Sequence, residues 1–145
     1  MKNKNLENSL FSYISRIRIK SCCFIENEAK KRGITLSYSY MRIIIILHFN
    51  KKLSMKELTN RLGRDKSTVT SLVNKLEAEG YIKKTVCDFD KRMTYLELKD
   101  KSQEILDTIF EISEVFHEKV VEMIGEEDTD TLYRINKKLL DNWNL

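Results

Sequence analysis

Apolar residues in the middle of the chain recur at helical spacing, and short polar turns separate the periodic segments. Four of them lie at i, i+3, i+4 and i+7, namely Val69, Leu72, Val73 and Leu76. This spacing predicts one buried helical stripe. Asp65 precedes the stripe as an N-cap, and its carboxylate complements the positive end of a helix. We therefore expect a helix over residues 65–79.

A shorter helix is predicted just before it. Ser54 followed by Glu57 is a capping-box pattern, in which a hydroxyl and a carboxylate satisfy free backbone N–H groups at the helix start. Gly63 follows Leu62 and can adopt the left-handed conformation of a tight helix exit. Together the two segments predict a helix-turn-helix.

A hairpin is predicted after Gly80. Residues 81–86 and 93–98 are rich in β-branched, aromatic and aliphatic side chains, as strands are. The six residues between them, 87–92, include four charged side chains and would form an exposed tip. A capped helix-turn-helix followed by a hairpin with a charged tip predicts a winged helix.

Long apolar helices are predicted on both sides of this segment. Apolar spacing predicts helices over 6–32, ending at Gly33, and over 38–49, beginning at residues 35–37. Residues 43–46 are four consecutive isoleucines, which by propensity alone could form a strand, but their flanks favour a fully buried helix. Helix returns from Lys99 until Gly125, and a last helix begins at Thr129 or Asp130.

The terminal helices are too long to be covered by a small winged helix alone. We expect them to build a symmetric dimer interface. The predicted fold is mainly α (α+β), a winged helix-turn-helix with long terminal helices in one compact domain overall. We expect residues 1–36 and 100–145 to form its dimerisation region and residues 37–99 to form the winged helix-turn-helix region.

The polar face of the 65–79 helix indicates its partner. It carries short hydroxyl and amide side chains and, after the Asp65 cap, has no acid until Glu77. Such side chains let a helix approach base edges in the major groove of DNA. The alternative is an ordinary solvated face, which usually carries more Glu/Lys pairs at i,i+4.

Charge is distributed unevenly along the chain. The formal net charge is +4, but residues 1–50 carry +6, residues 51–101 carry +5 and residues 102–145 carry −7. The basic segments can bind the phosphate groups of a nucleic acid, and the acidic end should face away from DNA. No transmembrane run or secretory leader is recognisable. Three cysteines without an export signal indicate reduced thiols in the cytoplasm.

The order V-T-x-L-V-x-K-L-E-x-x-G-Y-I at residues 69–82, followed by D-x-D-K-R at 88–92, resembles the MarR family of bacterial winged-helix transcription regulators. The resemblance implies a homodimeric regulator, expected to be a repressor, that binds pseudo-palindromic duplex DNA through the 65–79 helix. It also implies that Arg92 enters the minor groove and that Asp90 orients it. The chain departs from the family pattern in having no proline, since Ser37 and Phe89 stand in the usual places. Lys83 or Lys84 replaces a wing arginine and loses its planar fork.

The predicted DNA-binding residues lie on the recognition helix, at its start and on the wing. They are Arg64, Lys66, Ser67, Thr68, Thr70, Ser71, Asn74, Lys75, Lys84, Asp90, Lys91 and Arg92.

The resemblance further implies release from DNA by a small amphipathic, anionic aromatic effector. Tyr13, Arg16, Tyr38 and Tyr40 are the predicted ligand-binding residues, because they offer stacking faces, hydroxyls and one cation where the first two helices should approach the wing domain. The alternative role of each is packing at a helix junction.

A thiol-based redox-sensing regulator of the same fold is an alternative function. It would use the vicinal pair Cys22 and Cys23. In relatives that sense oxidants, however, the cysteine lies near the N-terminal end of the first helix, where this chain has Phe11. Two small core or interface residues are therefore the favoured interpretation of the pair.

Enzymatic and metal-binding functions lack their residue patterns. His48 and His117 have no Cys or His at metal spacing, so neither a metal site nor a cofactor is predicted. No phosphate loop, nucleophile elbow or catalytic set is recognisable. RNA binding would call for more exposed aromatic residues than Tyr81 and Phe89. A helical dimerisation protein that does not bind DNA would explain both ends of the chain but neither the hairpin nor the Ser/Thr/Asn face.

Overall fold

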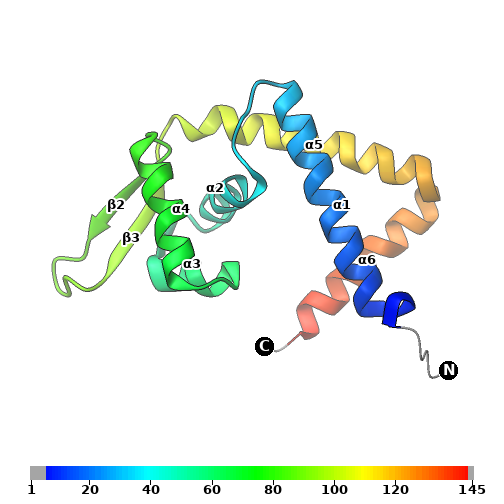
Figure 1. Ribbon diagram of the computed structural model, residues 1–145, viewed down its shortest axis with the longest axis horizontal. Helices are drawn as coiled ribbons and strands as arrows, with labels where there is room; N and C mark the ends of the chain where they lie inside the picture. The colour runs from blue at the N-terminus through cyan, green and yellow to red at the C-terminus, as the bar shows by residue number, and fades with distance from the viewer. Residues whose placement is uncertain (1–5, 144–145) are drawn as a thin grey trace. The chain divides into compact units, whose positions relative to one another are not determined.

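The computed structural model describes residues 6–143 (Figure 1). Its elements, in chain order, are η1 (Leu6–Asn8), α1 (Leu10–Lys31), α2 (Tyr38–Asn50), β1 (Lys52–Ser54), α3 (Met55–Leu62), α4 (Lys66–Ala78), β2 (Ile82–Val86), β3 (Thr94–Leu98), α5 (Ser102–Ile124) and α6 (Glu126–Asn142). The predicted mainly helical winged helix is confirmed.

The contacts between residues divide the chain into two units. The first extends to Ile109 and contains the winged helix, α1 and the beginning of α5; the second starts at Phe110 and contains the rest of α5 and α6. The functional division at residues 36 and 99 stays a prediction.

The first unit contains a three-stranded antiparallel sheet in the order β1-β3-β2. Leu96 at the centre of β3 is paired with Leu53 of β1 and with Lys84 of β2. Strand β1 is absent from the sequence prediction. It has only three residues and forms by pairing with a strand more than forty positions later, so its own sequence carries little signal.

The core of the first unit lies where α2, α3 and α4 meet the sheet. Its fully buried side chains include Met41, Ile44, Leu58, Val73 and Leu96. Removal of these side chains from water stabilises the unit by about 25 cal/mol for each Å² of apolar surface. The predicted stripe of α4 is confirmed, except that Leu72 is only half-buried.

Helix α2 contains the four isoleucines at 43–46, so their helical prediction is confirmed. The expectation of a fully buried helix is wrong. Ile43 and Ile44 are buried, but Ile45 and Ile46 are partly exposed and Phe49 is 70% exposed, because successive helical residues point in different directions. At 13 residues α2 is too short to cross a membrane, and no other helix within residues 6–143 is long and apolar enough to do so.

Local capping confirms the predicted helix-turn-helix. The Ser54 hydroxyl accepts from the Glu57 N–H at 3.2 Å, and the Glu57 carboxylate accepts from the Ser54 N–H at 2.7 Å. Gly63 is left-handed, with φ of 61°. The Asp65 carboxylate then accepts from the Thr68 N–H at 2.8 Å and begins α4.

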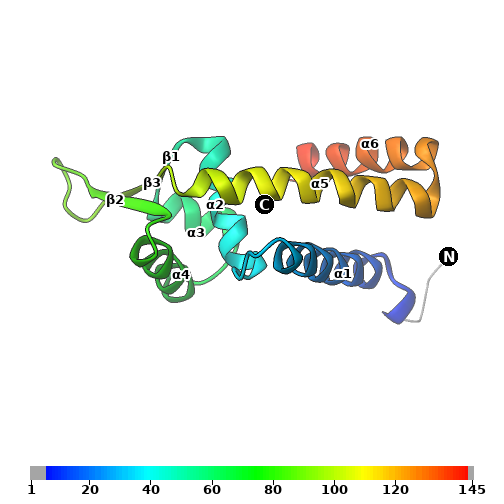
Figure 2. The same cartoon turned by 90° about the horizontal axis from the view of Figure 1, so that it is seen from above.

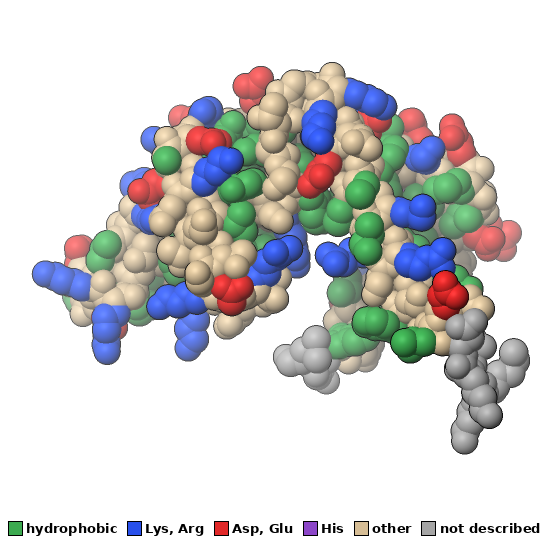
Figure 3. All heavy atoms as spheres, in the orientation of Figure 1, with side chains coloured by type: hydrophobic (Ala, Val, Ile, Leu, Met, Phe, Trp, Pro, Cys, Tyr) green, Lys and Arg blue, Asp and Glu red, His purple; other side chains and the backbone are tan. Residues whose placement is uncertain are grey.

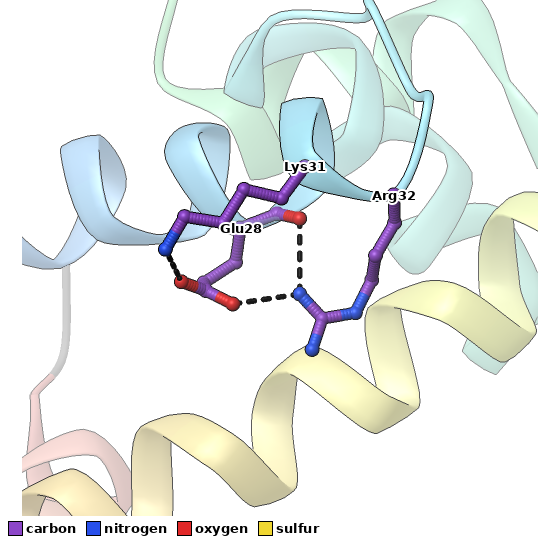
Figure 4. A network of polar contacts seen from close by, with 3 residues as sticks. All are labelled: Glu28, Lys31 and Arg32. Atoms are coloured by element: carbon purple, nitrogen blue, oxygen red, sulfur yellow. Dashed lines mark hydrogen bonds and ion pairs between the residues drawn. The ribbon is translucent and has the colours of Figure 1, made fainter.

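Both ends of α1 are fixed by local hydrogen bonds. The α-helix begins at Leu10, not at Leu6 as predicted, because the Ser9 hydroxyl accepts from the Ser12 N–H at 3.1 Å and η1 precedes it. Near the other end, the Glu28 carboxylate accepts from Lys31 and from Arg32, both at 2.7 Å (Figure 4). Arg32 also donates to the Glu28 carbonyl oxygen, so its side chain covers the end of the helix.

In the second unit, α6 begins earlier than predicted. Gly125, with φ of 84°, turns the chain, and α6 starts at Glu126 rather than at Thr129 or Asp130. Three acids in its first turn, at 126–128, complement the positive end of the helix. The Thr129 hydroxyl donates to the Gly125 carbonyl oxygen at 2.7 Å, and the residue as a whole is 2% exposed, so Thr129 lies inside the first turn.

Candidate nucleic-acid interface

Helix α4 and the hairpin that follows it present most of the predicted DNA-binding side chains. We call the hairpin of β2 and β3, with residues 87–93 between them, the wing. Figure 2 shows the wing extending beyond α4. In Figure 3, Lys and Arg side chains gather along the lower edge of the first unit, under the wing and under the turn between α3 and α4 seen in Figure 1.

The hydroxyl groups of α4 differ in their availability. Thr68 donates its hydroxyl proton to Asp65 Oδ2 at 2.6 Å, and Thr70 donates to the Lys66 carbonyl oxygen at 2.7 Å. Ser67 and Ser71 are exposed, and within residues 6–143 their hydroxyls have no hydrogen-bond partner. The two serines are therefore the hydroxyl groups of α4 that remain free to donate to an incoming ligand.

The cap of α4 keeps its charge. Hydrogen bonds from the side chain and backbone of Thr68 hold the pKa of Asp65 below its ordinary value of 3.8. The carboxylate is therefore ionised at neutral pH, and it occupies a helix N-terminus of the kind that binds anions.

Two predicted DNA-binding residues of α4 contact other parts of the protein. The Asn74 amide oxygen accepts a hydrogen bond from the Lys84 ammonium of β2. The Lys75 ammonium lies 4.9 Å from the centre of the Tyr40 ring and 4.0 Å from Glu79 Oε1. Lys75 is thus directed to α2 and to the next turn of its own helix.

An arginine on the wing is held by a neighbouring acid. Arg92 Nε donates to Asp90 Oδ1 at 3.1 Å, and Arg92 Nη2 donates to Asp90 Oδ2 at 3.3 Å. These bonds lower the pKa of Asp90 from its ordinary value of 3.8. The Arg92 side chain is nevertheless 91% exposed, so the pair orients a guanidinium that can still meet a phosphate or a minor groove.

Basic side chains also surround a pocket of about 340 Å³ between α3, the start of α4 and the wing. Lys56, Lys66 and Arg92 bring three cations from these three elements. Thr59 and Asn60 add polar groups, and this mixture suits a phosphate oxygen of a nucleic acid.

The α3 residues of this pocket are not among the DNA-binding residues predicted from the sequence. Lys56, Thr59 and Asn60 lie at i, i+3 and i+4, so a helical reading of α3 places them on one face. This spacing is the feature of the sequence from which the polar face of α3 could have been predicted.

The predicted effector residues have separate partners. The Tyr13 hydroxyl donates to Asn8 Oδ1 at 3.3 Å, whereas the Tyr40 ring lies under Lys75. The Tyr38 N–H donates to Glu26 Oε1 at 2.7 Å, which joins the start of α2 to α1, and burial raises the pKa of the Tyr38 hydroxyl. These contacts do not bring the tyrosines together, and they give each a structural role. Arg16 is exposed on α1.

The cysteines are present as free thiols. Cys22 is half-buried and close enough to Tyr38 to influence its hydroxyl, Cys23 is exposed, and Cys87 is half-buried on the wing. Adjacent helical residues point about 100° apart, so Cys22 and Cys23 face different surroundings.

Comparison with known proteins identifies the family. The MarR family pattern matches residues 33–93, which include α2, α3, α4 and much of the wing. The chain is 30% identical over 132 residues to the transcriptional regulator SarZ of Staphylococcus epidermidis, covering 83% of this chain and 84% of that protein. It is 26% identical over 136 residues to the transcriptional regulator BilQ of Clostridium symbiosum, covering 92% of each.

Solved structures share the fold. A mutant of MarR from E. coli, complexed with operator DNA, superimposes with a TM-score of 0.79 at 16% identity, covering 94% of this chain and 99% of that one. The sequence similarity to SarZ extends over most of both proteins, and the fold agrees with it. The chain belongs to the MarR family of winged-helix transcription regulators.

Proposed function

We propose that this regulator is a cytoplasmic homodimeric repressor that binds pseudo-palindromic duplex DNA. In each protomer α4 lies in the major groove, and Arg92 of the wing reaches the neighbouring minor groove or its phosphates. The observation that carries the proposal is the convergence of Lys56, Lys66 and Arg92, from three elements, on one pocket.

Seven of the predicted DNA-binding residues divide into two groups by chemistry. Cations at the start of α4 and on the wing neutralise phosphates and set affinity; they are Arg64, Lys66, Lys91 and Arg92. Ser67, Ser71 and Asn74 present short polar groups and read base edges. The E. coli MarR complex with operator DNA supports this arrangement by analogy of fold.

Exposed apolar side chains support the homodimer. On α1 they include Leu10, Phe11 and Ile17; Leu139 lies on α6, and Trp143 directly follows that helix. Large apolar patches are rare on the surface of monomeric proteins, and a second copy offers a matching surface for such side chains in a symmetric dimer. Repression follows from occupancy alone, since a bound dimer excludes other proteins from the DNA it covers.

A binding assay with purified protein tests the proposal. Operator candidates are first selected from genomic fragments, and fluorescence anisotropy then compares the selected duplex, a random duplex and single-stranded DNA. We expect the selected duplex to bind about a thousandfold more tightly than random duplex at physiological salt. Equal affinity for all three DNAs, or a monomer by sedimentation at micromolar concentration, would contradict the proposal.

Release by a small anionic aromatic compound forms the regulatory part of the proposal. A compound lowers operator affinity only if it binds the DNA-free state more tightly than the DNA-bound state. Calorimetry with salicylate, with and without operator, measures this difference directly. Equal affinity for salicylate in both titrations would indicate that another signal, such as oxidation of Cys22 or Cys23, controls DNA binding.

A further inference from the structure

A lysine on the wing holds an amide on the recognition helix. The Lys84 ammonium of β2 donates to Asn74 Oδ1 of α4 and lies 3.6 Å from Glu77 Oε2, one turn further along the same helix. The Lys84 side chain is only 28% exposed, so it lies against α4. Two acceptors on one helix thus fix a single ammonium from the neighbouring strand.

This contact determines which way the Asn74 amide points. An ammonium group has donors and no acceptor, so the amide atom that faces it must be the oxygen. The Asn74 Nδ2 group then points away from Lys84, and it donates to no other protein group within residues 6–143. An asparagine side chain that could present either end is thereby held in one orientation.

We propose that Lys84 is a positioning residue for base recognition, which makes Asn74 a hydrogen-bond donor toward DNA. The inference rests on the proposed placement of α4 in the major groove. A fixed Nδ2 donor favours the acceptors there, which are guanine N7 and O6, adenine N7 and thymine O4. It disfavours cytosine, whose N4 group in the major groove is a donor.

The alternative role for Lys84 is a phosphate contact. Its ammonium is already close to the Glu77 carboxylate, which offsets its charge. Its neighbour Lys83 lies on the opposite face of β2, is exposed and is paired across the sheet with Glu97. Lys83 therefore serves as a matched control that has the same charge, one residue away, without the contact to Asn74.

Selection from a pool of randomised duplexes tests the inference. Wild-type protein, Lys84→Met and Lys83→Met are compared for base preference at each position and for the salt dependence of binding. We expect wild type to prefer an acceptor-bearing base at one position, and Lys84→Met to weaken that preference at least about fivefold there while leaving other positions unchanged. Lys83→Met should keep the wild-type preference.

Three further variants separate positioning from folding. Lys84→Arg retains a group that only donates, so it should retain the preference. Asn74→Ala should abolish the preference, and adding Lys84→Met to it should have no further effect on base choice. Circular dichroism checks that every variant is folded.

Two outcomes would overturn the inference in distinguishable ways. If Lys84→Met keeps the base preference and only reduces the salt slope, as expected for a phosphate contact, Lys84 does not position Asn74. If wild-type protein selects no common sequence at all, the proposed function itself fails and the inference fails with it.

Discussion

Asp90 holds the guanidinium of Arg92 through two hydrogen bonds while leaving it exposed to solvent. The bonds are 3.1 Å from Nε and 3.3 Å from Nη2, and the Arg92 N–H adds a third to the same carboxylate at 3.0 Å. An acid two residues earlier thereby limits the directions in which a long side chain can point. Less rotamer freedom is then lost when that side chain meets DNA.

Arg92→Ala should weaken binding to selected and random duplex alike. The variant removes one phosphate or minor-groove charge, so the salt slope should fall by about one. Asp90→Asn keeps the arginine charge but loses the ionic pair, so the slope should remain while affinity decreases. Anisotropy titrations over a range of salt measure both quantities. A loss confined to the selected duplex would contradict this role for Arg92.

Asn74→Ala should instead reduce the difference in affinity between the selected and the random duplex. A side chain that reads a base contributes about 1–3 kcal/mol of discrimination, with little effect on non-specific binding. Ser71→Ala should act in the same direction, because the Ser71 hydroxyl is exposed on the same helix. The comparison uses the same two duplexes as for Arg92. If the Arg92 and Asn74 variants each lost equal affinity for both DNAs, the assignment of affinity to Arg92 and of base discrimination to Asn74 would be contradicted.

Local chemistry explains what could be predicted from sequence. The Ser54–Glu57 box, the left-handed Gly63 and the Asp65 cap each depend on residues within three or four positions of one another. Their patterns are therefore visible along the chain. The error in the predicted start of α6 has a local cause as well. Thr129 matches the usual N-cap type, but Gly125 had already turned the chain.

Features that depend on distant partners could not be predicted in this way. Strand β1 exists because Lys52–Ser54 pairs with β3, and the basic pocket exists because α3 and the wing approach each other. The contacts of Lys84 with Asn74 and of Lys75 with Tyr40 likewise join different elements. Its place on the recognition helix or on the wing made each lysine a DNA-binding candidate, whereas its protein partner appears only in the fold.

Leu96→Ala should destabilise the winged helix. Leu96 is fully buried and is paired with both neighbouring strands, so truncation leaves a cavity between the sheet and the helices. We expect a loss of roughly 2–5 kcal/mol in unfolding free energy. Val86→Ala, at an exposed wing position, should change it by no more than about 0.5 kcal/mol. Urea denaturation followed by circular dichroism compares the two, and equal effects would contradict the assignment of Leu96 to the core.

Phe11→Glu on α1 and Leu139→Glu on α6 should weaken the proposed homodimer without unfolding the chain. Both side chains are exposed in the protomer, so the substitutions create no cavity within it. Burial of one large apolar side chain contributes about 1.5–3 kcal/mol to the stability of the dimer, and each substitution occurs twice in a twofold-symmetric dimer. Sedimentation velocity should show dissociation at micromolar concentration.

A wing substitution supplies the control for the dimer. Phe89→Glu introduces the same side chain at a fully exposed position between β2 and β3 and should leave the oligomeric state unchanged. If all three variants sediment like wild type, the apolar faces of α1 and α6 do not form the interface.

Acid should weaken the end of α1 through Glu28. Hydrogen bonds from Arg32, and then from Lys31, hold the pKa of the Glu28 carboxyl below its ordinary value of 4.5. The native state therefore releases this proton more readily than the unfolded chain. The resulting stabilisation is complete above pH 4.5 and is lost as the pH falls through the lower native pKa.

Two matched variants test this order of causes. Arg32→Gln removes the hydrogen bond with the larger effect on the pKa of Glu28 and should move that pKa back toward 4.5 by more than Lys31→Gln does. NMR titration of the Glu28 side chain measures the pKa in each protein. Glu28→Gln should lose the stabilisation itself, so its difference from wild type in unfolding free energy should shrink as the pH falls below 4.5. If the pKa of Glu28 is unchanged in both Lys31→Gln and Arg32→Gln, the network seen in Figure 4 does not govern the carboxylate.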